Sequence, residues 1–350
     1  METQVQIQDV KGKTEGTQIH KLLSYASRLR ILDLRFEIEF LSDVVLPTYK
    51  GSTLHGGFGR ALRQLHCTCA AKPDISGDYS NNAQPASQSS GVCPYHFIFE
   101  TKINDDAFRF LRSVPSVPHP YLIEPSLEDT KEYRAGELIP FTIRLFGSAT
   151  AYAVNVIEAV SLFGKLGITR RKVPFRIVKA ASNDRAGKSK IIYDGALNKY
   201  VTIPKPFHWK PAENVSFSDQ LTIRFLTPTR LVQAEHLKDN VDLSIIITSI
   251  SRRLAALAYY AEGVKGVARI IDGRRVPTDE IAVGGISLKW KDYRRYSNRQ
   301  SSSMLFGGIV GEVTFGNVSE DYLQLLQFGT LLHLGKQTTF GLGKYEIVPK

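Results

Sequence analysis

The order of predicted secondary-structure elements repeats once along this 350-residue chain, and that repeat most constrains its fold. In each half a strand and a helix are followed by two strands, a second helix and a closing strand. Alternating apolar residues predict the strands, and apolar residues three or four positions apart predict the helices. The order β-α-β-β-α-β defines the ferredoxin-like unit. We therefore predict an α+β protein with two tandem ferredoxin-like (RRM-like) domains.

The predicted elements divide into two sets. The first set consists of strands Leu32–Phe40, Tyr95–Phe99, Ile139–Phe146 and Val173–Val178 and helices Ser52–Leu65 and Tyr152–Leu166. The second set consists of strands Gln220–Phe225, Ile286–Trp290, Ile309–Phe315 and Lys344–Val348 and helices Leu243–Tyr260 and Asp321–Leu332. We predict an N-terminal extension over 1–30, domains over 31–205 and 216–350, and a disordered insertion near 71–92, which is rich in Ser, Asn, Gly, Ala and Pro.

The chain is basic, with 45 Lys and Arg against 34 Asp and Glu and a formal net charge of +11. Such a balance favours polyanionic partners. Residues 289–300 interleave five basic side chains with Trp290, Tyr293 and Tyr296, a mixture that suits stacked bases and phosphates. The alternative interpretation is a solvated strand edge whose charges prevent aggregation.

Nothing in the sequence points to a membrane. The chain has no apolar run of about 18 residues, which a transmembrane helix needs. Its first residues are too polar for a signal peptide. We therefore expect a cytoplasmic protein with no membrane partner.

The C-terminus carries a glycine-rich loop between the last predicted helix and the last predicted strand. Glycines and basic residues together favour an anion-binding cradle of backbone N–H groups. The spacing matches neither a P-loop nor a dinucleotide-binding fingerprint. The residues expected to contact an anionic ligand here are Gly335, Lys336, Thr338, Thr339, Gly341, Gly343 and Lys344.

Four segments together resemble the CRISPR repeat-RNA-processing endoribonucleases of the RAMP superfamily. They are Lys50-Gly-Ser-Thr-Leu-His-Gly-Gly-Phe-Gly-Arg-Ala-Leu62, Cys93-Pro-Tyr-His-Phe-Ile-Phe-Glu100, Arg295-Tyr-Ser-Asn-Arg-Gln300 with Gly307-Gly-Ile-Val-Gly-Glu312, and the C-terminal loop. The resemblance implies that the second domain binds RNA and that the partner is CRISPR repeat RNA within its precursor (pre-crRNA). Other CRISPR effector or adaptation proteins are further expected partners.

The resemblance also implies a metal-independent cut within the repeat that releases guide RNAs and requires no cofactor. The 2′-hydroxyl attacks the neighbouring phosphate and leaves a cyclic phosphate and a 5′-hydroxyl. Histidine can transfer the protons near neutral pH, and Lys or Arg can stabilise the phosphorane charge. A non-catalytic RAMP subunit of an effector complex is the main alternative. A nucleic-acid-binding protein unrelated to CRISPR is the second alternative.

The site residues follow from these expectations. His55 is the first catalytic candidate and His66 the second, with assistance from Tyr49 and Lys50. The family often has a basic residue where this chain has His55, and a histidine near the position of Arg60. His96 and His333 are expected to be structural. The expected RNA contacts outside the glycine-rich loop are Arg60, Arg294, Arg295, Ser297, Asn298, Arg299 and Gln300.

The three cysteines permit a structural zinc ion. Cys67, Cys69 and Cys93 could bind it together with His66 or His96, because thiolate and imidazole suit tetrahedral zinc. However, the C-x-C spacing differs from the usual C-x₂-C zinc knuckle. If His66 binds zinc it is not the general base, so these two hypotheses compete.

Overall fold

The computed structural model shows a mixed α/β protein with antiparallel sheets. It describes residues 18–67, 93–101, 118–183, 188–211, 220–233, 236–237, 241–264, 267, 281, 283–297 and 302–348. The predicted insertion at 71–92 lies outside these residues. Of the helices in the described ranges, none has both the length and the apolar character that a bilayer-spanning segment needs.

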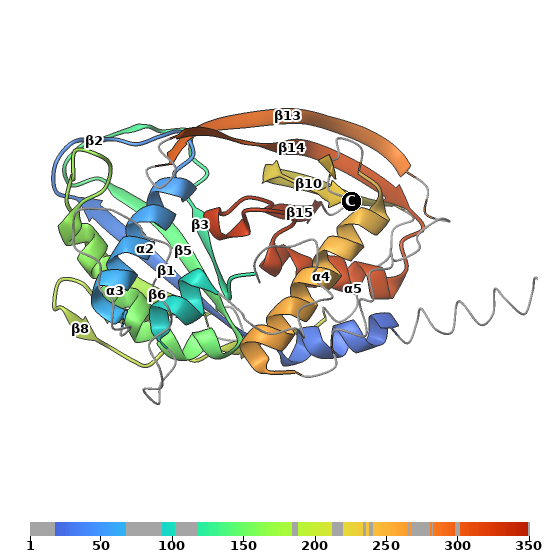
Figure 1. The fold of residues 1–350 in the computed structure, drawn as a ribbon, viewed down its shortest axis with the longest axis horizontal. Helices are drawn as coiled ribbons and strands as arrows, with labels where there is room; N and C mark the ends of the chain where they lie inside the picture. The colour runs from blue at the N-terminus through green and yellow to red at the C-terminus, as the bar shows by residue number, and fades with distance from the viewer. Residues whose placement is uncertain are drawn as a thin grey trace, which may run out of the picture.

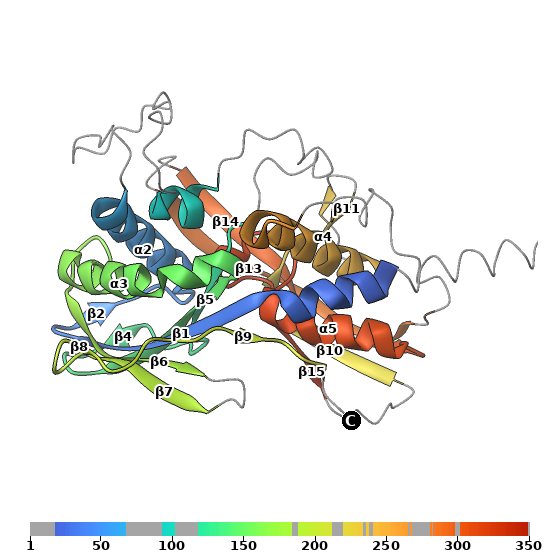
Figure 2. The ribbon, with the colours of Figure 1, turned by 90° about the horizontal axis from the view of Figure 1, so that it is seen from below.

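The first sheet has seven strands in the order β3-β5-β1-β6-β7-β8, with β9 also paired to β1. They are β1 (Arg30–Phe40), β3 (Tyr121–Pro125), β5 (Leu138–Phe146), β6 (Phe175–Asn183), β7 (Ser189–Asp194), β8 (Lys199–Tyr200) and β9 (Phe207–His208). Helices α2 (Gly51–His66) and α3 (Ala153–Leu166, after the 3-10 turn η3, Gly147–Tyr152) lie on the same side of this sheet (Figure 2). The alternating apolar side chains of β1 pack beneath them.

The second sheet has four strands in the order β13-β14-β10-β15. They are β10 (Gln220–Thr229), β13 (Val283–Ser297), β14 (Ser302–Gly316) and β15 (Tyr345–Val348). Helices α4 (Leu243–Glu262) and α5 (Glu320–Leu332) complete this half, and a helix over 18–28 packs Leu22 and Ala26 into their core. Two small ladders pair β2 (Val44–Val45) with β4 (Glu132–Tyr133) and β11 (Val232–Gln233) with β12 (His236–Leu237).

One predicted strand is wrong. Residues Tyr95–Phe99 are helical and overlap the π-helical turn η1 (His96–Glu100). The second strand of the first unit is instead β3 (Tyr121–Pro125). A short apolar run does not separate a buried strand from a buried helix turn by periodicity alone. Here Tyr95 and Phe99 stack across one helical turn, with ring centroids 5.6 Å apart, as i and i+4 neighbours on a helix do.

The two halves share a boundary on the first sheet. Ile31, Leu122 and Phe146 point away from α2 and α3 and belong to the core of the second half. Strands β13 and β14 form a long hairpin that runs from the second half towards α2 along the top of Figure 1. The hairpin and the glycine-rich loop therefore both meet the first half near the start of α2.

Candidate functional site

The glycine-rich loop needs its glycines for close packing. Gly335, Gly341 and Gly343 all have positive φ angles, which favour glycine. A Cβ atom at Gly343 would lie 1.9 Å from the carbonyl oxygen of Leu334, and one at Gly335 would lie 2.2 Å from that of Arg230. The loop backbone is thus fixed against its own first residues and against the end of β10.

The loop's N–H groups already have protein partners. Those of Gly335, Lys336, Gly341, Gly343 and Lys344 donate, respectively, to Ser249 Oγ, Arg230 O, Thr338 O, Pro228 O and Thr227 Oγ1. These five groups are therefore not available as the predicted anion cradle, and that part of the prediction is wrong. Contacts between RNA and the side chains of this loop remain a prediction.

We expect Gly343→Ala to destabilise the protein more than Gly263→Ala. Both glycines have left-handed backbone, at φ 75° and 68°, which costs alanine about 1–2 kcal/mol. A Cβ at Gly263 meets nothing within 4 Å, whereas one at Gly343 collides with backbone. The collision should add about 1–3 kcal/mol, measurable by urea unfolding. Equal losses in the two variants would contradict this account of the loop.

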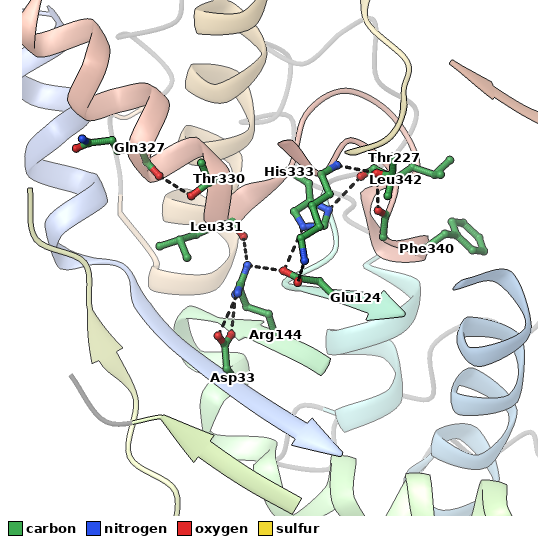
Figure 3. Close-up of polar contacts among 12 residues, drawn as sticks. Asp33, Glu124, Arg144, Thr227, Gln327, Thr330, Leu331, His333, Phe340 and Leu342 are labelled. Carbon is green, nitrogen blue, oxygen red and sulfur yellow. Dashed lines mark hydrogen bonds and ion pairs between the residues drawn. The ribbon is translucent and has the colours of Figure 1, made fainter. Parts of the chain in front are cut away.

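A buried charge cluster holds the loop on the first sheet (Figure 3). Arg144 on β5 donates to both carboxylate oxygens of Asp33 on β1, at 2.6 and 3.0 Å, and to the carbonyl oxygen of Leu331 at 2.9 Å. Its Nη1 also lies 2.9 Å from Glu124 on β3. The Glu124 carboxylate in turn contacts His333 Nε2 at 3.2 Å and the Lys344 ammonium. Glu124 on β3 thus contacts both ends of the loop, and Arg144 links it to Asp33 on β1 and to the end of α5.

The charges in this cluster stabilise one another. Burial alone would raise the pKa of Glu124, but Arg144, His333 and Lys344 hold it well below its ordinary value. Burial alone would lower the pKa of Arg144, but Asp33 and Glu124 raise it. Burial lowers the pKa of His333, against the pull of Glu124. The His333 side chain is completely enclosed, which is consistent with the structural role expected from the sequence.

His55 lies where the loop meets α2. Its ring centroid is 4.0 Å from that of Phe340 in the loop and 4.8 Å from that of Phe99 in η1. The imidazole is half-buried. Two aromatic side chains, one from each half of the chain, therefore fix the orientation of the ring and leave part of it at the surface.

Tyr49 joins the same loop to the hairpin. Its hydroxyl donates to the carbonyl oxygen of Phe340 at 2.7 Å, and its ring stacks on Tyr293 of β13 at 4.9 Å. Burial raises the pKa of Tyr49 well above its ordinary value, so the phenol stays protonated and remains a donor. Tyr49 thus positions the loop and the hairpin beside α2.

An open pocket of about 250 Å³ adjoins this stack. Its lining residues are Pro47, Thr48, Tyr49, Lys131 and Tyr293. On the hairpin the Lys291 ammonium lies 5.0 Å from the centre of the Tyr293 ring, and Lys289 and Trp290 are exposed. Aromatic faces beside cations can hold bases and phosphates together.

The remaining predicted site residues differ in their exposure. Lys50 is buried, and its ammonium donates to the carbonyl oxygen of Glu128 at 2.7 Å; burial lowers its pKa. Arg60 is exposed on α2, Lys336 is exposed in the loop, and Thr338 and Thr339 are buried. Arg294, Arg295 and Ser297 lie on β13, paired with β14, whereas Asn298, Arg299 and Gln300 lie outside the described residues.

His66 lies at the other end of α2, against α3. Its Nδ1 is 3.1 Å from the amide nitrogen of Asn155, and its Nε2 is 3.2 Å from the carboxylate of Glu158. Its side chain is only 14% exposed. The structure thus places His55, but not His66, beside the loop and the hairpin.

The predicted zinc ligands come together in part. Cys67, Cys93 and His96 gather at the end of α2, and Cys69 lies outside the described residues. The histidine of this cluster is His96 and not His66. The expected conflict between His66 as a zinc ligand and His66 as a base therefore does not arise among these residues.

Sequence reasoning missed the aromatic partners and the charge cluster. Phe340 and Phe99 lie in segments that the sequence singles out, but only the structure shows that both rings contact His55. Asp33 and Arg144 sit on the strand face that alternation assigns to solvent. Their direct pairing across β1 and β5 was detectable only once the register was known.

Two family models match the chain. Residues 29–205 match a model described as an N-terminal domain. Residues 223–345 match the model of the CRISPR-associated endoribonuclease Cas6. The first match covers the sheet that carries the charge cluster, and the second covers the hairpin and the glycine-rich loop.

Individual proteins that resemble this chain share little sequence identity with it. An uncharacterized protein of Archaeoglobus fulgidus is 23% identical over 332 residues, 93% of this chain and 99% of that protein. A structure of Thermus thermophilus Cas6 is 14% identical, with a TM-score of 0.46 over 91% of this chain and 99% of that chain. A partial Cas6-RT-Cas1–Cas2 complex is 11% identical, with a TM-score of 0.51 over 91% of this chain and 46% of that chain. The last likeness indicates a shared fold.

Proposed function

We propose that this chain, whose residues 223–345 match the model of the CRISPR-associated endoribonuclease Cas6, cuts precursor CRISPR RNA within the repeats to release guide RNAs. The observation that carries the proposal is the contact of His55 with Phe340, at 4.0 Å between ring centroids. This contact joins a proton-transfer group on α2 to the glycine-rich loop of the matched domain. The basic and aromatic hairpin beside it supplies a surface for RNA.

The proposed reaction needs no metal ion. The 2′-hydroxyl loses its proton and forms a bond to the adjacent phosphorus, while the bond from phosphorus to the 5′-oxygen breaks and that oxygen gains a proton. The products are a 2′,3′-cyclic phosphate and a 5′-hydroxyl. His55 transfers one of these protons, because imidazole can act as base or acid near neutral pH. Exposed cations nearby, Lys336 and Lys291, would stabilise the negative charge of the transition state.

RNA would lie along the hairpin and over the start of α2. Tyr293 offers a ring face for a base, and the open pocket that Tyr49 and Lys131 also line adjoins it. Arg294 and Arg295 follow on the same strand and are proposed phosphate contacts. Lys50 and His66 are better explained as structural residues, because each already has a partner within the protein.

The order β3-β5-β1-β6 within the first sheet matches the order β13-β14-β10-β15 of the second sheet. This match supports two tandem ferredoxin-like domains. The domain limits at 31–205 and 216–350 stay a prediction. One matched structure is a partial Cas6-RT-Cas1–Cas2 complex. We accordingly propose other CRISPR proteins as further partners.

The test is a cleavage assay with the repeat RNA encoded beside the gene. EDTA is added together with the RNA, and a second substrate carries a 2′-deoxy sugar before the scissile phosphate. We expect one cut in the first RNA, with a 5′-hydroxyl product that a kinase can label directly, and no cut in the second. Specific binding without cleavage would overturn the nuclease proposal in favour of a non-catalytic RAMP subunit. Absence of both would overturn CRISPR-RNA recognition as well.

A further inference from the structure

A cluster of sulfur and nitrogen ligands lies apart from the proposed cleavage site. The thiol sulfurs of Cys67 and Cys93 and a ring nitrogen of His96 all lie within 4.8 Å of one another. One of these separations, between His96 Nδ1 and Cys93 Sγ, is 3.3 Å. Nothing in the proposed reaction uses these three side chains.

The spacing of the three atoms fits a tetrahedral metal ion. With Zn–S bonds of about 2.3 Å and Zn–N bonds of about 2.0 Å, ligand atoms in such a site lie about 3.5–3.8 Å apart. The observed atoms would thus reach coordination distance through small side-chain rotations. Two thiolates would also balance the charge of a divalent ion, which reduces the cost of burying it.

The local structure brings these ligands together. Cys67 ends α2, and its N–H donates to the carbonyl oxygen of Arg63, so its position follows that of the helix. Cys93 and His96 are three residues apart at the start of a helical segment, where the Phe97 N–H donates to the carbonyl oxygen of Cys93. Residues i and i+3 share one face of such a turn. Two segments separated by 25 residues in sequence therefore converge.

We propose that Cys67, Cys93 and His96 bind a structural zinc ion. Thiolate and imidazole ligands favour zinc over magnesium or calcium, which prefer oxygen. The ion would fix η1 to the end of α2. Because η1 also carries Phe99, whose ring packs on His55, the ion would support the proposed cleavage site from a distance. A disulfide between Cys67 and Cys93 is the competing chemistry.

The first test measures metal in the purified, tag-free full-length chain, produced with zinc in the medium. We expect about one zinc ion per chain, because a structural site binds one ion. Modification of the thiols of the wild-type protein should release that ion to a colorimetric chelator. Wild-type protein without zinc would overturn the proposal, as would an intact mass lower by two hydrogen atoms, which indicates the disulfide.

Variants then identify the ligands. Cys93→Ser and His96→Gln should lose the zinc, and cobalt substitution of the wild-type protein should give a thiolate-to-cobalt charge-transfer band that both variants lack. His66→Gln is the matched control, because His66 is adjacent to Cys67 but its ring contacts Asn155 and Glu158 instead. It should keep both the zinc and the band. Loss of zinc in this control, or full retention in the two ligand variants, would overturn the assignment.

Discussion

Replacing His55 by alanine should reduce cleavage of repeat RNA by about 10²–10⁴-fold, the usual contribution of a positioned proton-transfer group. The reason is that His55 sits between Phe340 and Phe99 at the junction of α2, the loop and the hairpin. RNA binding should change little, because most of the proposed RNA surface lies on the hairpin. Single-turnover cleavage rates and filter binding on the same preparations measure the two effects separately.

Two controls separate chemistry from packing. His55→Phe keeps a ring for the contacts with Phe340 and Phe99 but has no titratable nitrogen, so it should be as inactive as the alanine variant. His66→Ala should cleave at close to the wild-type rate, since His66 lies against α3. Wild-type rates in both His55 variants would contradict a role for His55 in proton transfer. A loss confined to His66→Ala would assign that role to the other histidine.

Replacing Arg144 by methionine should lower the free energy of unfolding by about 3–5 kcal/mol, because it strands buried carboxylates. Arg144 is 9% exposed at the side chain and pairs with Asp33, which is 7% exposed. Urea unfolding followed by circular dichroism measures the change. Arg176→Met is the matched control. Its pair with Glu39 is 2.7 Å long, but the Arg176 side chain is 62% exposed, so the loss should be at most about 1 kcal/mol.

A double variant tests the pairing directly. Asp33→Asn removes one carboxylate that Arg144→Met leaves unpaired, so the combined variant should lose less stability than the sum of the two single losses. Additive losses would show that the two side chains are not coupled. Equal losses in Arg144→Met and Arg176→Met would contradict the buried character of the cluster.

The loss of folding stability at low pH provides a second test of the same cluster. The pKa of Glu124 lies well below its ordinary value in the folded protein. Its contribution to stability is therefore complete above the unfolded pKa of about 4.3 and is lost as the pH falls below that value. In Arg144→Met this acid-dependent loss should be smaller, because the largest attraction that keeps Glu124 ionised has been removed.

The docking of the glycine-rich loop explains why these predictions bear on function as well as stability. Glu124 holds both His333 and Lys344, and these residues begin and end the loop that carries Phe340. Phe340 in turn contacts His55. Damage to the buried cluster should therefore also slow cleavage, although Asp33, Glu124 and Arg144 are not proposed to touch RNA.

The sequence by itself determined the element order and most of the element positions. Alternation along β1 and helical periodicity along α2 are local consequences of burying one face, so they can be read without the fold. The net charge and the basic and aromatic residues of β13 pointed to a nucleic-acid surface, because composition can also be read without the fold. The Tyr95–Phe99 segment failed because a short apolar run carries no period.

Only the tertiary structure decided which faces and loops meet. Asp33 and Arg144 lie on the strand face that alternation assigns to solvent, yet the second half covers that face and makes them a buried pair. The glycine-rich loop had the composition of an anion cradle, but the N–H groups of Gly335, Gly343 and Lys344 donate to acceptors on α4 and β10. His55 and His66 share a helix, and only their distant neighbours in sequence distinguish them. Long-range contacts of this kind depend on the packing of both halves, which no local pattern encodes.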